Sequence, residues 1–93
     1  MYWLLYDICS QRRRLRVVQL CKDYGMKRIQ KSCFFGTIDL SRMKEFEKKM
    51  SGLVEAEDCV CMIPVNQSMM SKVRLWGEEQ PDFGMEDELL CFI

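Results

Sequence analysis

The chain begins with the stretch MYWLLYD, residues 1–7, in which six apolar or aromatic residues are followed by a carboxylate. Consecutive apolar positions are typical of a strand that is buried on both faces. Asp7 ends this strand, and an arginine cluster, residues 12–14, follows close behind it. A carboxylate at a strand end beside arginines indicates a place where a phosphate and a metal ion could meet.

The length of 93 residues predicts one small domain, near the lower limit for a self-sufficient core, so oligomerisation is expected from size alone. Apolar residues make up 48% of the chain, which indicates a folded protein. No apolar stretch is long enough to span a membrane, and the N-terminus lacks the positively charged segment of a secretion signal. We therefore expect a cytoplasmic protein that does not bind a membrane.

Six cysteines and no histidine limit the chemistry available to the chain. There is no CxxC pair, and Cys59 and Cys61 alternate with apolar residues, so buried free thiols are predicted rather than disulfides or a zinc site. The lack of histidine excludes a histidine general base and a nucleophile paired with one. Any catalysis must therefore use carboxylates, metal, tyrosine or arginine.

The formal charge of zero conceals an uneven distribution. Residues 1–31 contain eight Lys or Arg and two acids, whereas residues 77–93 contain six acids and no base. This asymmetry predicts a surface that faces nucleic acid in the first part of the chain. In the last part it predicts either a different partner or a contact that neutralises the chain's own charge.

The order of elements predicts an α+β, ferredoxin-like domain over residues 1–65. Ser10 is expected to cap the first helix and Gly25 to end it, and Ser41 is expected to cap the second, which ends near Gly52. Pro64 is expected to stop the last strand. The predicted elements are a strand at 2–8, a helix at 11–24, two short strands between 28 and 38 with a turn near Lys31 and Ser32, a helix after Ser41, and a strand at 59–65.

The ferredoxin-like arrangement leaves one face of the sheet without helices. Because the strands at 1–6 and 59–63 are apolar at consecutive positions, that face also needs a cover, and a second copy packed sheet against sheet is the simplest one. A face-to-face homodimer would bring two copies of Asp7 near the two-fold axis. Two such carboxylates repel unless a proton or a hard cation lies between them, and Mg²⁺ suits oxygen ligands of this kind.

The remaining residues, 66–93, are predicted to form a C-terminal strand and an acidic and apolar docking tail. Residues 72–76 have the composition of an extra strand, and residues 88–93 form an apolar terminus after an acidic run. The tail either adds a strand to another sheet or folds back on its own domain.

The arginines at positions 12–14 lie in the first turn of the first predicted helix, where the helix dipole favours acidic residues instead. An anion such as phosphate would be attracted there by the side chains and by the free amides. Arg14 shares a helix face with apolar residues and is predicted to point toward Asp7, while Arg12 and Arg16 suit solvent or a nucleic-acid backbone. The alternative is an ion pair between Arg14 and Asp7 with no ligand.

Five segments, in this order and spacing, resemble the CRISPR-associated protein 2 family, the small partner of the CRISPR integrase. They are LYDI at 5–8, RRRLR at 12–16, KDYG at 22–25, RIQKSCF at 28–34 and DCVCMIP at 58–64. The resemblance implies a ferredoxin-like homodimer that acts in spacer acquisition. Family members are described as metal-dependent endonucleases on single-stranded RNA or DNA, and others as adaptors that bridge integrase dimers without catalysis.

The resemblance also implies roles for individual residues. Asp7 would hold one Mg²⁺ per dimer, shared between the two copies. The implied catalytic residues are Asp7, Tyr6, Arg14, Arg28 and Phe34, and the implied nucleic-acid-binding residues are Arg12, Arg13, Arg14 and Arg16. The alternatives are that Tyr6 and Phe34 are core or interface aromatics and that Arg28 is solvated. The family often has a polar or acidic residue where this chain has Phe35, so that strand supplies no second carboxylate.

Three functions follow from these observations. The first is a magnesium-dependent endonuclease that uses Asp7. The second is a non-catalytic adaptor, in which a basic dimer surface binds DNA and the tails hold two integrase dimers apart. The third is a toxin-type ribonuclease of the virulence-associated family, which shares the fold.

Overall fold

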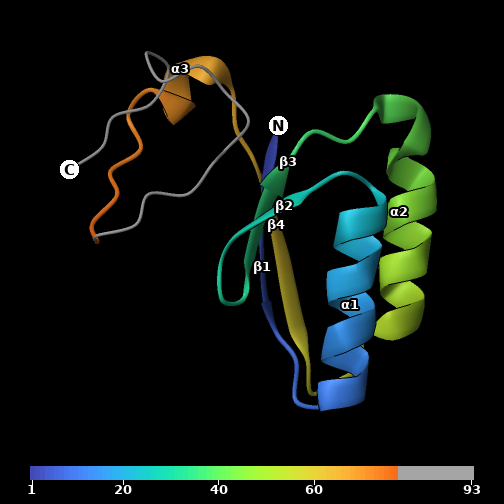
Figure 1. Cartoon of the computed structure of the whole chain (residues 1–93). Helices are drawn as coiled ribbons and strands as arrows, with labels where there is room; N and C mark the ends of the chain where they lie inside the picture. The colour runs from blue at the N-terminus through green and yellow to red at the C-terminus, as the bar shows by residue number, and fades with distance from the viewer. Residues whose placement is uncertain (78–93) are drawn as a thin grey trace.

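The computed structural model describes residues 1–77 as a four-stranded antiparallel sheet with two helices packed on one face (Figure 1). The strand order is β2-β3-β1-β4, so the first strand lies in the middle of the sheet. The elements are β1 (Tyr2–Asp7), α1 (Gln11–Asp23), β2 (Lys27–Gln30), β3 (Cys33–Gly36), α2 (Leu40–Leu53), β4 (Cys59–Pro64) and α3 (Gln67–Met70). The predicted ferredoxin-like order is confirmed.

One helix cap and two turns follow directly from the sequence. Ser10 caps α1, since its hydroxyl accepts a hydrogen bond from the Arg13 amide at 3.3 Å. Gly25, just past the helix end, has a φ of +82°, the left-handed conformation that ends helices and that glycine adopts without strain. Between β2 and β3, Ser32 has a φ of 70°, which confirms a tight turn at the predicted position.

The start of α2 differs from the prediction. Asp39, not Ser41, holds the N-cap position, and its side chain makes no capping hydrogen bond. The turn begins earlier because the Asp39 carbonyl accepts the Arg42 amide at 2.9 Å. The helix also runs through Gly52 to Leu53, since packing of its apolar face against the sheet outweighs the cost of one glycine.

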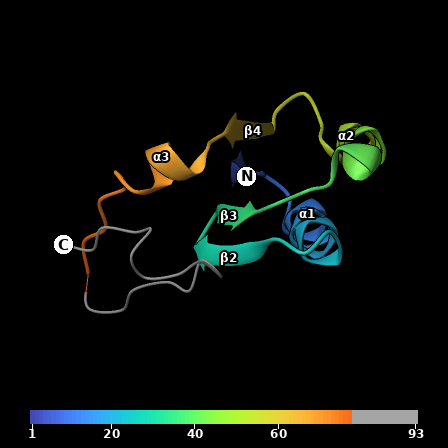
Figure 2. The same ribbon diagram turned by 90° about the horizontal axis from the view of Figure 1, so that it is seen from above.

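The main core lies between the helices and the sheet. Residues on one face of β1 and β3 pack against apolar positions of α1 and α2 that recur every three or four residues. The largest completely buried side chains are Phe34, Phe46 and Leu4, which come from β3, α2 and β1. This core fixes both helices over the same face, as Figure 2 shows from above.

A second apolar cluster lies on the opposite face, where α3 covers one end of the sheet (Figures 1 and 2). Met70 is fully buried against Phe35, and its sulfur accepts a hydrogen bond from the Trp3 indole nitrogen at 3.3 Å. Val73 and Leu75 pack against the same cluster. Over residues 66–75 the chain therefore folds back on its own domain, one of the two predicted alternatives.

The extra strand predicted at residues 72–76 is absent from the structure. Its apolar side chains Val73 and Leu75 pack against the face of the sheet, and a segment in that place does not pair with either sheet edge. The apolar terminus at 88–93 lies outside the described residues.

Among residues 1–77, the Asp7 end of β1 and the same face of β4 are uncovered. Leu5 on β1 is 42% exposed and Ile63 on β4 is 43% exposed. Burial of both strand faces, predicted from their apolar composition, is therefore correct only for the part of β1 beneath α3, since Cys59, Cys61 and Ile63 are exposed along β4. No helix of residues 1–77 has the length and apolar character that crossing a bilayer requires.

Candidate functional site

Asp7 is exposed at the end of the central strand β1. Side chains alternate along a strand, and Leu4 and Tyr6 point into the helix-side core, so Asp7 and Leu5 project from the opposite face. A hollow of about 350 Å³ opens here, with Asp7 in its lining. The other lining residues are Leu5, Tyr6, Gln30, Lys31, Ser32, Cys33, Cys59 and Cys61.

Three thiols share this hollow with Asp7. Cys59 is the direct cross-strand partner of Asp7, and Leu5 is paired with Cys61 on one side and Cys33 on the other. The cysteines of the described chain are free, as predicted, but their burial is only partly as predicted. Cys21 and Cys33 are buried, whereas Cys9, Cys59 and Cys61 are exposed. Cys59 and Cys61 are exposed because they lie on the uncovered part of the sheet.

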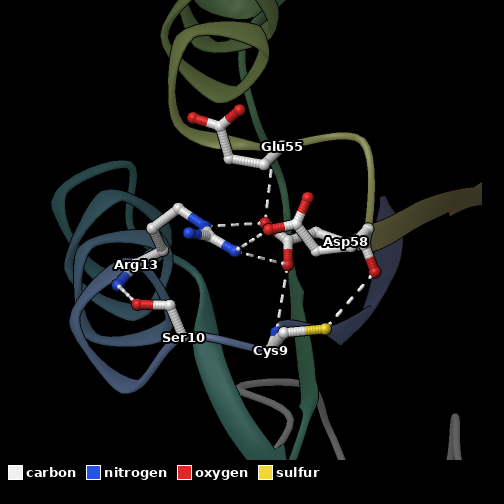
Figure 3. Close-up of polar contacts among 6 residues, drawn as sticks. Cys9, Ser10, Arg13, Glu55 and Asp58 are labelled. Atoms are coloured by element: carbon white, nitrogen blue, oxygen red, sulfur yellow. Dashed lines mark hydrogen bonds and ion pairs between the residues drawn. The ribbon is translucent and has the colours of Figure 1, made fainter.

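A carboxylate that the sequence analysis did not select holds this end of the sheet together. The Asp58 side chain has no solvent-exposed surface and accepts hydrogen bonds from three residues (Figure 3). Its oxygens accept the Cys9 amide at 3.0 Å, the Glu55 amide at 3.0 Å, and Arg13 Nε and Nη2 at 2.9 and 3.1 Å. Asp58 therefore ties the β1–α1 turn and the first turn of α1 to the loop before β4.

The hydrogen bond from Arg13 is the main reason why the pKa of Asp58 lies well below its usual range, and the Cys9 amide adds to the effect. Hydrogen bonding to Asp58 likewise raises the pKa of Arg13. Asp58 directly precedes Cys59, and Cys9 lies two residues after Asp7. The contact thus fixes the two strand ends that carry Asp7 and Cys59.

The arginine cluster divides into different roles. Arg13 binds Asp58 and also Glu57, at 2.9 Å, so it is engaged in holding the fold. Arg14 is half-buried, and the structure contains no ion pair between it and Asp7. Arg12 and Arg16 are exposed, as predicted, and Arg16 lines a separate hollow of about 480 Å³ between α1 and α2.

Of the remaining residues of the implied site, Tyr6 also lines the hollow of Asp7, whereas Phe34 and Arg28 lie elsewhere. The rings of Tyr6 and Phe34 belong to the helix-side core, with centroids 6.2 Å apart. Arg28 is exposed on the edge strand β2, in register with Phe34. The structure thus brings Asp7 together with Cys59, Cys61 and Cys33, and not with Arg14, Arg28 or the ring of Phe34.

One signal in the sequence could have identified Asp58. An aspartate three residues after Glu55 and directly before a strand is placed to accept loop amides through its side chain. Nothing in the local sequence shows that Arg13, 45 positions earlier, is its partner.

Asp7 is the one carboxylate among residues 1–77 that lines the hollow of about 350 Å³. Among residues 1–77, no group of three or more His, Cys, Asp or Glu side chains could hold a metal ion. Mg²⁺ usually binds through one or two carboxylates and keeps several waters. One Asp7 from each of two protomers would satisfy that requirement.

Comparison with known proteins identifies the family that the five sequence segments resemble. The family described as CRISPR associated protein Cas2 matches residues 1–73. The CRISPR-associated endoribonuclease Cas2 3 of Synechocystis is 32% identical over 84% of this chain and 85% of its own. The CRISPR-associated endoribonuclease Cas2 of Desulforudis audaxviator is 30% identical over 72% of this chain and 66% of its own.

Solved structures agree in fold. The hypothetical protein TT1823 from Thermus thermophilus superposes with a TM-score of 0.65 at 29% identity, over 70% of this chain and 79% of that one. Streptococcus pyogenes Cas2 superposes with a TM-score of 0.71 at 20% identity, over 82% of this chain and 98% of that one, a likeness of fold. With its strand order, its Asp7 strand end and its family match in agreement, the chain belongs to the CRISPR-associated protein Cas2 family.

Proposed function

We propose that this chain acts in CRISPR adaptation as a homodimeric, nucleic-acid-binding partner of the integrase. In this proposal it also hydrolyses phosphodiester bonds of single-stranded RNA or DNA at an Mg²⁺ shared by two copies of Asp7. The observation that carries the proposal is the position of Asp7, exposed at the end of the central strand on the uncovered part of the sheet. The names of the relatives, CRISPR-associated endoribonucleases, support the reaction class.

The uncovered part of the sheet supports a dimer formed through that face. Leu5 and Ile63 are large apolar side chains that are each more than two fifths exposed. A domain this small has a small core, so leaving such side chains exposed to water is unfavourable. Packing sheet against sheet would bury both side chains and bring the two Asp7 residues together. Without a cation, the two carboxylates would oppose this association.

The chemistry assigned to the site is simple. When bound, Mg²⁺ supplies charge stabilisation at the phosphate and a water of lowered pKa. The two Asp7 carboxylates hold the ion, and Asp58 keeps the strand end that carries Asp7 in place through the Cys9 amide. The rings of Tyr6 and Phe34 support β1 from the core side.

The charge of the described chain supports binding to nucleic acid. Residues 1–77 contain all 14 Lys and Arg and only eight of the 14 acids. Arg12 and Arg16 are exposed on α1, where they can contact phosphates without reading sequence. Arg13 is committed to Asp58, so we assign it to the fold rather than to nucleic acid.

A second function, the non-catalytic adaptor, is favoured by Phe35. This side chain is 2% exposed and packs in the cluster with Trp3 and Met70, so β3 brings no second carboxylate toward Asp7. A site with one carboxylate from each chain holds a metal weakly, and the dimer could then serve mainly to hold DNA and integrase.

Cleavage and integration assays on the same preparations separate the two functions. Wild type, Asp7→Asn and the control Asp39→Asn, an exposed aspartate at the start of α2, are incubated with labelled single-stranded RNA and duplex DNA, with Mg²⁺ or EDTA. If the protein is an endonuclease that uses Asp7, wild type and Asp39→Asn should cleave in the presence of Mg²⁺ but not EDTA. Asp7→Asn should not cleave.

Cleavage by Asp7→Asn at the wild-type rate would contradict the hypothesis of an endonuclease that uses Asp7. Integration with the cognate integrase then tests the adaptor, which requires Asp7→Asn to integrate as well as wild type. Deletion of residues 78–93 is expected to abolish integration, and unimpaired integration by this truncated chain would rule out a role for the tail.

A further inference from the structure

The neighbour of Asp7 on β4 suggests a property of the site beyond magnesium binding. Asp7 and Cys59 are direct cross-strand partners, both exposed, and both line the 350 Å³ hollow. Side chains directly opposite one another in an antiparallel pair have Cβ atoms about 4.5–5.5 Å apart. A carboxylate oxygen and a thiol sulfur at this separation can reach one ion together.

We propose that Asp7 and Cys59 from two protomers form a four-ligand site for Zn²⁺, with two oxygens and two sulfurs. This inference rests on the dimer of the proposed function, because each chain supplies only two of the ligands. A two-fold axis that passes between the Asp7 residues also passes close to the adjacent Cys59 residues. The four donors give the tetrahedral coordination that zinc prefers.

The sulfur ligands decide which metal binds. Thiolate is a soft ligand that selects zinc, whereas Mg²⁺ requires oxygen and near-octahedral geometry. On binding, each Cys59 thiol releases its proton to solvent and its sulfur forms a bond to the ion. A tetrahedral ion with four protein ligands keeps no open position for water, so zinc would exclude Mg²⁺ and inhibit hydrolysis.

Cys59 is the ligand because of its register with Asp7. Cys61 is paired with Leu5, one step further from the strand end, and Cys33 is buried on β3. Cys9 is exposed but lies outside the hollow, and its thiol donates to the Glu57 carbonyl. Cys9→Ser is therefore a matched control for Cys59→Ser.

The test combines zinc titration, Co²⁺ absorption and sedimentation on the full-length chain. Wild type is expected to bind one Zn²⁺ per two chains, with a dissociation constant far below that for Mg²⁺. With Co²⁺ it is expected to show thiolate-to-cobalt charge-transfer absorption. Cys59→Ser should weaken zinc binding at least about tenfold and lose this absorption, since even outer-shell changes cost that much. Cys9→Ser should behave like wild type.

Sedimentation separates failure of the site from failure of the dimer. A dimeric wild type that binds no zinc, or that binds it equally well after Cys59→Ser, overturns the zinc site and leaves the dimer intact. A chain that stays monomeric at all concentrations, with or without zinc, overturns both the shared site and the proposed dimer.

Discussion

Arg13 and Asp58, 45 positions apart in sequence, form a two-pronged ion pair at the end of the sheet that carries Asp7. The guanidinium binds both carboxylate oxygens, at 2.9 and 3.1 Å, while backbone amides of Cys9 and Glu55 fill the remaining acceptor positions. A fully satisfied carboxylate of this kind holds three segments of the chain in one arrangement. It places Asp7 without touching it.

Loss of the Asp58 carboxylate should destabilise the fold. Asp58→Asn leaves the Arg13 guanidinium without its main partner and is expected to lower the Tm by on the order of 5 °C or more. Glu57→Gln removes a carboxylate that binds the same guanidinium but is 57% exposed, so it should change the Tm little. Thermal unfolding followed by circular dichroism compares the two variants. Equal effects would show that burial of Asp58 is unimportant.

Acid should destabilise the protein through the same residue. The pKa of Asp58 is lower in the folded chain than in the unfolded chain, so its contribution to stability is fully present above the unfolded value, about pH 4. The contribution decreases as the pH falls from there toward the folded pKa. Urea unfolding of wild type should show this loss below about pH 4, and Asp58→Asn should show less of it. An identical pH dependence in both proteins would contradict this assignment.

Thiol accessibility tests which cysteines the fold buries. Burial raises the pKa of Cys21 to about 12, and burial also raises the pKa of Cys33, so both should resist alkylation at pH 8. Cys9, Cys59 and Cys61 are exposed and should react readily. Mass spectrometry of peptides gives each rate.

The same measurement reports on the dimer. If the uncovered part of the sheet is the interface, alkylation of Cys59 and Cys61 should slow as protein concentration rises, while alkylation of Cys9 should not. Concentration-independent rates at all three positions would argue against association through this face.

The hydroxyl of Tyr6 should be dispensable. It is buried and has no hydrogen-bond partner among residues 1–77, so Tyr6→Phe should leave the free energy of unfolding unchanged or raise it by up to about 1–3 kcal/mol. Cleavage by this variant should equal that of wild type because the ring belongs to the helix-side core. Loss of cleavage in a stably folded Tyr6→Phe would instead indicate a direct part in the chemistry.

Two adjacent methionines test the packing of α3 on the sheet. Met70 is fully buried, and Met70→Ala should lower the free energy of unfolding by about 2–5 kcal/mol. Met69 is 54% exposed, so Met69→Ala should change it by less than about 0.5 kcal/mol. Urea denaturation measures both. A small, equal effect would mean that residues 66–75 do not stabilise the domain.

The local patterns of the sequence were sufficient for most of the fold. The Ser10 cap, the left-handed Gly25 and the turn at Ser32 depend on interactions within a few residues, and each was predicted correctly. The second helix was placed less well, because its start depends on a backbone hydrogen bond of Asp39 and its end on packing against the sheet. The prediction of a strand at 72–76 was wrong, because Val73 and Leu75 pack on the face of the sheet instead.

By itself, the sequence determined the strand that ends at Asp7, the basic first helix and the ferredoxin-like order, since hydrophobic periodicity, caps and turns are local. Tertiary structure decided that Arg13 binds Asp58, that Tyr6 and Phe34 face the core, and that Cys59 stands beside Asp7. These relationships join residues far apart in sequence. They depend on strand register and helix placement, which packing of the whole sheet fixes and no local pattern records.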